Sequence, residues 1–184
     1  WDDTGFTADG DFVDRDTLHH GGMILRRRCD LTKEWAKSQE GDDMTETSPI
    51  WFITGASSGL GLALAEAVLA RGWRAAVTAR KPGALDDLVA RYGDHVLPLV
   101  LDVRSKASID EAVAAAEKHF GGIDVLVNNA GYGYLAAIEE GDDQEIRDQF
   151  ETNVFGLIAV TKRVLPGMRA ASRPCVQHLV ARRP

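Results

Sequence analysis

The fold of this chain is decided by residues 50–61, Ile50-Trp51-Phe52-Ile53-Thr54-Gly55-Ala56-Ser57-Ser58-Gly59-Leu60-Gly61. Four apolar residues lead into a glycine-rich turn, and an apolar helical pattern continues through residues 62–70. A strand, a turn and a helix in this order are the context in which such glycines indicate a dinucleotide site. Gly55 then makes the tight turn, Gly59 lets the backbone approach a diphosphate, and Gly61 lets the helix pack against the strand. The alternative is a glycine-rich turn that holds no ligand.

A second motif, Asn128-Asn129-Ala130-Gly131, ends the apolar run of residues 123–127, and Asn153 follows inside a helical stretch. The order TGxxxGxG, NNAG and a helix asparagine resembles the short-chain dehydrogenases/reductases over about residues 44–170. The resemblance implies an α/β fold with a doubly wound parallel sheet, the Rossmann fold. It also implies an oxidoreductase that transfers hydride between a nicotinamide cofactor and a small carbonyl or alcohol substrate.

Apolar strand runs and helical patterns alternate along residues 44–170. Strands are expected at 50–54, 73–78, 96–101 and 123–127, and helices at 60–71, 83–91 and 105–119. This alternation predicts a parallel sheet with helices on both faces and right-handed crossovers. In the resembled family the strands take the order 3-2-1-4, with the ligand beyond the carboxyl ends of strands 1 and 4.

Several local signals set the ends of the expected helices. Ser105 is a good N-cap, and Gly121-Gly122 should stop the helix that it begins. A longer helical pattern starts at Asp142 and should end at Pro166-Gly167. We therefore expect a sheet truncated after about four strands and this long helix, with residues 123–127 left as an apolar edge.

The resemblance also assigns site residues. The cofactor-binding positions that it implies are Gly55, Ser57, Ser58, Gly59, Leu60, Gly61, Arg80, Asp102, Val103, Asn129, Ala130 and Gly131. By the same resemblance, Asn128 ties neighbouring strands together and Asn153 bends its helix and holds a water in the proton relay. The alternatives are an ordinary Asn/Gly turn for residues 128–131 and a solvent-facing amide for Asn153.

The end of the second expected strand indicates which cofactor is preferred. A site for NAD wants a carboxylate about 20 residues past the glycines to hold the ribose 2′-hydroxyl. Ala79, Arg80 and Lys81 stand there instead. Arg80 can donate charge-assisted hydrogen bonds to a 2′-phosphate, and Ser57 can add a hydroxyl. NADP is therefore expected rather than NAD, the alternative being an Arg80 that is merely solvated.

Asp102 ends the third expected strand, where an Asp of the resembled family accepts a hydrogen bond from the adenine amino group. The alternative is a purely local role ahead of the helix that begins at Ser105. The histidines lack metal-ligand spacing, so no metal site is expected. They are His19, His20, His95, His119 and His178.

Composition excludes several classes of protein. A net charge of -7 gives no electrostatic footprint for nucleic acid, and no apolar run approaches the length that spans a bilayer. Two cysteines do not make a disulfide framework, so a cytoplasmic protein is expected. A homo-oligomer is expected of the full-length form. Residues 44–170 are a partial dinucleotide-binding domain, 1–43 an acidic extension outside it, and 171–184 a tail unlike the family.

The family's acid/base pair, a Tyr followed four residues later by a Lys, is not matched. The three tyrosines are Tyr92, Tyr132 and Tyr134, and none is followed by a lysine at that spacing. A tyrosine has a pKa near 10 and needs such a cation to act near neutrality. The family's catalytic serine is also unmatched. We therefore expect this chain to be an inactive, poorly folding fragment of an oxidoreductase.

The two ends of the chain suggest different departures from the natural coding sequence, a frameshift near Ala171 and translation from upstream of the true start. One possible coding of residues 171–184, read one base out of register, contains Val-Ser-Asn-Ile-Ser-Ser, which resembles the family's fifth strand and serine motif. Met44 would be an ordinary first residue for this family. The codons for residues 39–41 can contain a ribosome-binding sequence a few bases before the Met44 codon. Residues 1–43 are then translated upstream DNA, the alternative being a genuine disordered arm.

Two functions of other classes remain open. One is a non-catalytic dinucleotide-binding regulatory protein on the same fold, because fold does not determine function. The other is an interaction module whose acidic residues 1–43 bind a basic partner.

Overall fold

The computed structural model describes residues 48–171 and 175–178, which belong to the second of two units, Thr47–Pro184. The interpretations of residues 1–43 and of most of 171–184 lie outside these residues. The strands are β1 (Ile50–Ile53), β2 (Arg74–Ala79), β3 (Val96–Val100), β4 (Val125–Asn128) and β5 (Cys175–His178). The helices are α2 (Gly59–Ala70), α3 (Asp86–Tyr92), η1 (Gly93–His95), α4 (Lys106–Phe120), α5 (Asp143–Phe150), η2 (Glu151–Gly156) and α6 (Leu157–Ala170).

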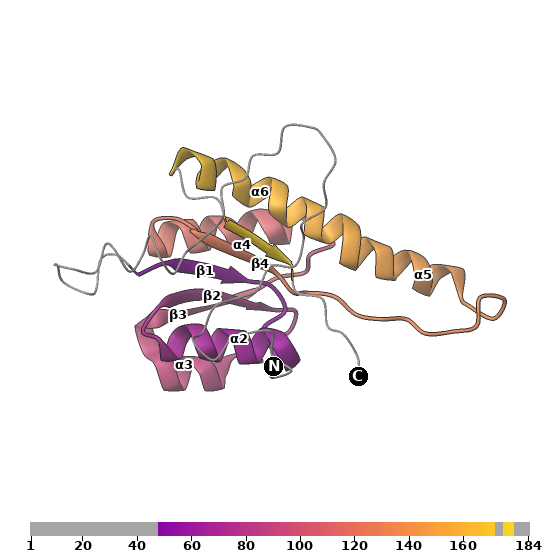
Figure 1. Ribbon diagram of the computed structural model, residues 1–184, viewed down its shortest axis with the longest axis horizontal. Helices are drawn as coiled ribbons and strands as arrows, with labels where there is room; N and C mark the ends of the chain where they lie inside the picture. The colour runs from indigo at the N-terminus through magenta and orange to yellow at the C-terminus, as the bar shows by residue number, and fades with distance from the viewer. Residues whose placement is uncertain (1–47, 172–174, 179–184) are drawn as a thin grey trace, which may run out of the picture. The chain divides into compact units, whose positions relative to one another are not determined.

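All the strands are parallel and lie in the order β3-β2-β1-β4-β5. Figure 1 shows α2 and α3 on one face of this sheet and α4 and α6 on the other. Two apolar cores follow from this arrangement, one around Ile53 and Leu88 and one around Phe52 and Val160. The doubly wound α/β fold and the order 3-2-1-4 are confirmed.

The sheet has one strand more than the four expected. Residues 175–178 pair in parallel with β4, with Leu126 opposite Val176. The expectation that residues 123–127 form an exposed edge is therefore wrong. The outer backbone groups of β4 need partners, and four residues are enough to supply a short parallel strand there.

The long helix differs from its prediction at both its middle and its end. Residues 151–156 form π-type turns between α5 and α6, so the predicted helix is present but widened where Asn153 lies. Pro166 lies inside α6, which continues to Ala170. Met168, only 1% exposed, explains the continuation, because ending the helix at Pro166 would take this side chain out of the core.

Helix α4 agrees closely with its prediction. The Ser105 hydroxyl accepts a hydrogen bond from the Ser108 N–H at 3.3 Å, which makes it the expected N-cap. Gly121 adopts a left-handed φ of 86° and ends the helix. Two ion pairs from Arg163, to Asp110 and Glu117, join α4 to α6.

No helix in the described ranges combines the length and apolar content that a bilayer crossing requires. Nor do residues 48–171 and 175–178 contain a cluster of three acidic, His or Cys side chains able to hold a metal ion.

Candidate functional site

The turn between β1 and α2 presents backbone N–H groups at the carboxyl edge of the sheet, and no side chain of the described residues caps them. Ser58 occupies the N-cap position of α2, but its side chain makes no capping hydrogen bond, and the first turn holds no acidic residue. Ser57, Ser58, Gly59 and Leu60 are exposed. The N–H groups that begin α2 therefore face solvent with the positive end of the helix dipole, an arrangement that suits an anion.

The three glycines of the turn are required for different reasons. Gly55 has φ +67°, and a Cβ there would lie 2.9 Å from the Ala130 Cα. A Cβ at Gly61 would collide with the Asn129 amide and the Gly55 carbonyl oxygen. Gly59 has φ +58°, but a Cβ there would have no described atom within 4 Å apart from its own stretch of chain. Gly61 thus allows the close packing predicted for it. Gly55 combines the left-handed turn conformation expected of it with a close contact to Ala130, and Gly59 borders open space.

Thr54 makes the central contacts of the site, a role that the sequence pattern did not indicate. Its hydroxyl, on a residue only 1% exposed, accepts hydrogen bonds from the N–H groups of Asn129 and Ala130, each at 2.9 Å. It also lies 3.2 Å from the Val127 carbonyl oxygen, to which it donates. A β-branched residue with a hydroxyl at the end of a buried strand is the signal that could have identified it.

The side-chain amides of the two asparagines contact different elements, and the tie expected of Asn128 is made by Asn129. The Asn129 amide donates to the carbonyl oxygens of Thr54 and Gly55 at 3.0 and 2.8 Å, so this residue ties β4 to β1. The Asn128 amide instead donates to the Thr161 hydroxyl at 3.1 Å and joins β4 to α6. The role assigned to Asn128 is therefore wrong. Successive strand residues face opposite sides, and Asn128 faces the helix layer.

Asn153 holds the loop that follows β4. Its amide oxygen accepts the Tyr132 N–H at 3.0 Å, and its amide nitrogen donates to the Tyr132 carbonyl at 2.8 Å. A Cβ on Gly131 would lie 2.9 Å from the Asn153 Oδ1, so this approach requires glycine. Asn153 is thus no free, solvent-facing amide, and the π-type turns of η2 occur where its side chain reaches the loop.

The end of β2 adjoins the glycine turn. The Thr78 carbonyl accepts the Ala56 N–H at 2.8 Å, and its hydroxyl accepts the Gly55 N–H at 3.3 Å. Arg80, two residues further on, is exposed, and no carboxylate in the described part of the chain pairs with it. Its guanidinium is therefore available beside the turn.

Asp102 has the local contacts that its alternative interpretation expects. Its Oδ1 accepts the Arg104 N–H at 3.0 Å, and its carbonyl accepts the Ser105 N–H at 3.0 Å. These contacts leave Asp102 half-exposed at the carboxyl end of the sheet. Val103 is buried, and a Cβ on Gly156 would lie 2.8 Å from its Cγ2. No contact joins Asp102 directly to the glycine turn among the residues described.

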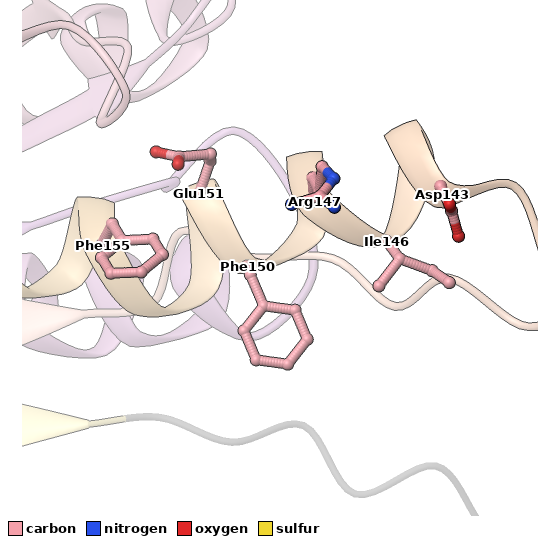
Figure 2. Close-up of a pocket in the computed structure, with 6 residues that line it drawn as sticks. All are labelled: Asp143, Ile146, Arg147, Phe150, Glu151 and Phe155. Atoms are coloured by element: carbon pink, nitrogen blue, oxygen red, sulfur yellow. The ribbon is translucent and has the colours of Figure 1, made fainter.

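A hollow of about 390 Å³ lies on α5 and η2, and none of the predicted cofactor residues lines it. Its lining is formed by Asp143, Ile146, Arg147, Phe150, Glu151 and Phe155. Figure 2 shows Ile146 and Phe150 projecting to the same side of the helix, with Glu151 on the other. Phe150 and Phe155 are 55% and 56% exposed. Such aromatic exposure indicates a surface for contact rather than a ligand cavity.

The family model that matches most of the chain is that of the short chain dehydrogenases, over residues 49–175. A second model, described as Agrobacterium tumefaciens protein Atu4866, matches residues 1–27.

Two curated relatives and one solved structure illustrate the similarity. Oxidoreductase BOA17 of Botryotinia fuckeliana is 47% identical over 121 residues, covering 65% of this chain and 44% of the relative. The NADP-dependent 3-hydroxy acid dehydrogenase YdfG of Salmonella typhi is 36% identical over 125 residues, covering 67% of this chain and 50% of the relative. The crystal structure of a short-chain dehydrogenase from Streptomyces avermitilis superposes with a TM-score of 0.70 at 44% identity. That match covers 73% of this chain and 50% of the other, so this chain spans about half the length of the proteins it matches.

Proposed function

The chain belongs to the short chain dehydrogenase family, and we propose that its described domain binds NADP(H) for an oxidoreductase acting on a small carbonyl or alcohol. The uncapped N-terminus of α2 carries this proposal. The first N–H groups of α2 lie at the carboxyl edge of the parallel sheet, beside β1. The strands β2 and β3 follow β1 on one side and β4 lies on its other side, so the strand order reverses direction there. This switch point is where open α/β sheets bind their ligands.

The space around the turn fits a dinucleotide diphosphate. Gly59 has a left-handed φ and no protein atom near its built Cβ, so phosphate oxygens can reach the backbone. Neither Ser57 nor Ser58 uses its hydroxyl within the described residues, and both can donate to the same anion. When bound, the nicotinamide supplies or accepts the hydride.

The remaining residues orient the two ends of the dinucleotide. We assign Arg80 to the 2′-phosphate, because it is exposed, unpaired with any described carboxylate, and close to the turn. Asp102 and Val103 serve the adenine end. Backbone groups of Ala130 and Gly131 serve the nicotinamide ribose, and Asn129 and Asn153 hold this backbone in place. Leu60 is exposed at the start of α2, where it covers the diphosphate.

Proton transfer has no assigned donor in the 184 residues. None of Tyr92, Tyr132 and Tyr134 is followed four residues later by a lysine. We infer that this chain binds the cofactor without turning it over. The expected result is no oxidation of NADPH above background with a panel of ketones and aldehydes, and measurable turnover would contradict the inference.

A fluorescence titration of the 184-residue chain with NADPH and NADH tests cofactor binding. We expect NADPH to bind more tightly than NADH, since only NADPH carries the 2′-phosphate for Arg80. Equal affinities would contradict the NADP preference, and no binding of either would contradict the site. Tight binding without turnover in a longer form bearing Tyr-x-x-x-Lys would favour the non-catalytic regulatory protein.

We also propose that the protein self-associates through the exposed face of α5, η2 and α6. Asp143, Arg147 and Glu151 alternate in charge at helical spacing beside the exposed Phe150. Two antiparallel copies of such a helix place Arg147 of each opposite Glu151 of the other, as a two-fold interface requires. Light scattering should show dimers that F150E converts to monomers. We also propose a cytoplasmic location, which the ordinary globular composition supports.

A further inference from the structure

Arg104 connects the adenine end of the proposed site to helix α5. Its Nε lies 3.6 Å from the Asp102 Oδ1, and its Nη1 lies 3.7 Å from the Asp148 Oδ2. A guanidinium has five donors in a fixed plane, so one side chain can serve two carboxylates. Arg104 therefore bridges the loop after β3 and the C-terminal half of α5.

The same stretch of helix contacts that loop a second time. Gly156 packs so closely on Val103 that a Cβ would lie 2.8 Å from the Val103 Cγ2 and 3.0 Å from its carbonyl oxygen. The loop after β3 is thus held by an ion pair at Asp148 and by packing at Gly156. Close packing of this kind allows little independent movement of the two segments.

Asn153 lies between these two contacts and binds the Tyr132 backbone on the opposite loop. Residues 148–156, one short segment, therefore contact both loops that we assign to the dinucleotide. One is the loop after β3, at the adenine end, and the other is the loop after β4, at the nicotinamide ribose.

The arrangement also determines which oxygen of Asp102 is free. Oδ1 accepts the Arg104 N–H at 3.0 Å and faces its guanidinium, whereas no described residue donates to Oδ2. We propose that Arg104, anchored by Asp148, is a positioning residue that turns the Asp102 Oδ2 toward the adenine amino group. This inference rests on the proposed function.

We expect Arg104 to orient the Asp102 carboxylate and to contribute little to the free energy of unfolding. The side chains of Arg104, Asp102 and Asp148 are 42%, 41% and 36% exposed, and ion pairs at such exposure add little to the free energy of unfolding. Removing the guanidinium should therefore change ligand discrimination while the melting temperature hardly moves.

The test compares NADPH with its hypoxanthine analogue, in which a carbonyl oxygen replaces the 6-amino group. A carboxylate accepts from the amino group and repels the carbonyl, so the wild-type chain should prefer NADPH by about tenfold. R104M should reduce this preference to about threefold or less, mainly by weakening NADPH. D148N, which removes only the distant anchor, should give a smaller reduction in the same direction.

R163M is the matched control, because Arg163 also bridges two carboxylates, Asp110 and Glu117, on α4. Its preference for NADPH should equal that of the wild type. An unchanged preference in R104M and D148N would overturn the inference, and so would an equal loss of both ligands, which would mean direct contact with Arg104. Failure of the wild type to bind either ligand would instead overturn the proposed function. Should R104M not fold, D148N alone decides.

Discussion

Helices α2 and α5 begin with equally good N-cap residues but satisfy their first N–H groups differently. The Asp142 carboxylate accepts from the N–H groups of Gln144 and Glu145 at 2.9 and 3.0 Å. Ser58, at the same position of α2, makes no side-chain cap. Both residue types are strongly preferred at N-caps, so their identity does not predict the difference. The N-terminus of α5 is capped by its own side chain, whereas that of α2 has no side-chain cap.

Acidic side chains reinforce the same contrast. The first turn of α5 holds Asp143 and Glu145, whereas the first turn of α2 holds no acid. Negative charge in a first turn compensates the helix dipole and would repel a phosphate. The N-terminus of α5 is thus stabilised by its own side chains, whereas we assign the N-terminus of α2 to ligand binding.

The largest expected effect comes from filling the space at α2. G59V adds a branched side chain at a position where a Cβ would meet no described atom beyond its own stretch of chain, so it obstructs the diphosphate rather than the core. NADPH affinity should fall by more than about a hundredfold, measured by fluorescence titration. Retention of wild-type affinity would show that the anion does not bind at this turn.

G72V is the control for backbone strain. Gly72 follows α2 at its other end, has φ +74°, and also has no atom within 4 Å of its built Cβ. Both variants should lose about 1–2 kcal/mol of unfolding free energy from the left-handed φ. Only G59V should lose NADPH, so a similar loss in G72V would attribute the effect to folding.

The second expected effect tests the charge beside the turn. R80A removes a guanidinium that no described carboxylate engages, and should weaken NADPH by about ten- to hundredfold while NADH stays nearly unchanged. R169A removes an exposed arginine from the end of α6 and controls for net charge. Equal losses for both cofactors would mean that Arg80 does not contact the 2′-phosphate.

Much of the fold could be predicted because its signals are local. Strand runs, helical periodicity and the glycines of residues 55–61 each depend on neighbouring residues, and they predicted the parallel sheet. The strand order came instead from the family resemblance. The Ser105 cap and the Gly121 stop of α4 are of the same kind. The close contacts of Gly55 and Gly61 also agree with the sequence pattern.

The parts that sequence analysis missed depend on partners distant in the chain. The Asn129 amide meets Gly55 and the Asn128 amide meets Thr161, and no local pattern decides which asparagine faces which element. Strand β5 forms because β4 offers unpaired backbone groups. Likewise α6 continues through Pro166 because Met168 is buried, and tertiary packing overrides the helix-breaking preference.

A smaller effect is expected on the closed terminus. D142A removes both capping hydrogen bonds of α5 and should lower the free energy of unfolding by about 1 kcal/mol. This corresponds to a fall of about 2–4 °C in melting temperature, measured by circular dichroism. NADPH affinity should not change, because Asp142 touches none of the assigned cofactor residues. A loss of binding would mean that α5 has to be intact for the site to form.

The smallest effect is expected for S58A, the same experiment on the open terminus. No capping hydrogen bond is broken, so the melting temperature should stay within about 1 °C of the wild type. The exposed hydroxyl is instead available to a phosphate, and NADPH affinity should fall by about two- to fivefold. D142A should therefore lose stability but not NADPH affinity, and S58A should lose NADPH affinity but not stability. If S58A melted as early as D142A, then Ser58 would cap α2 in solution, and the contrast between the two helices would not hold.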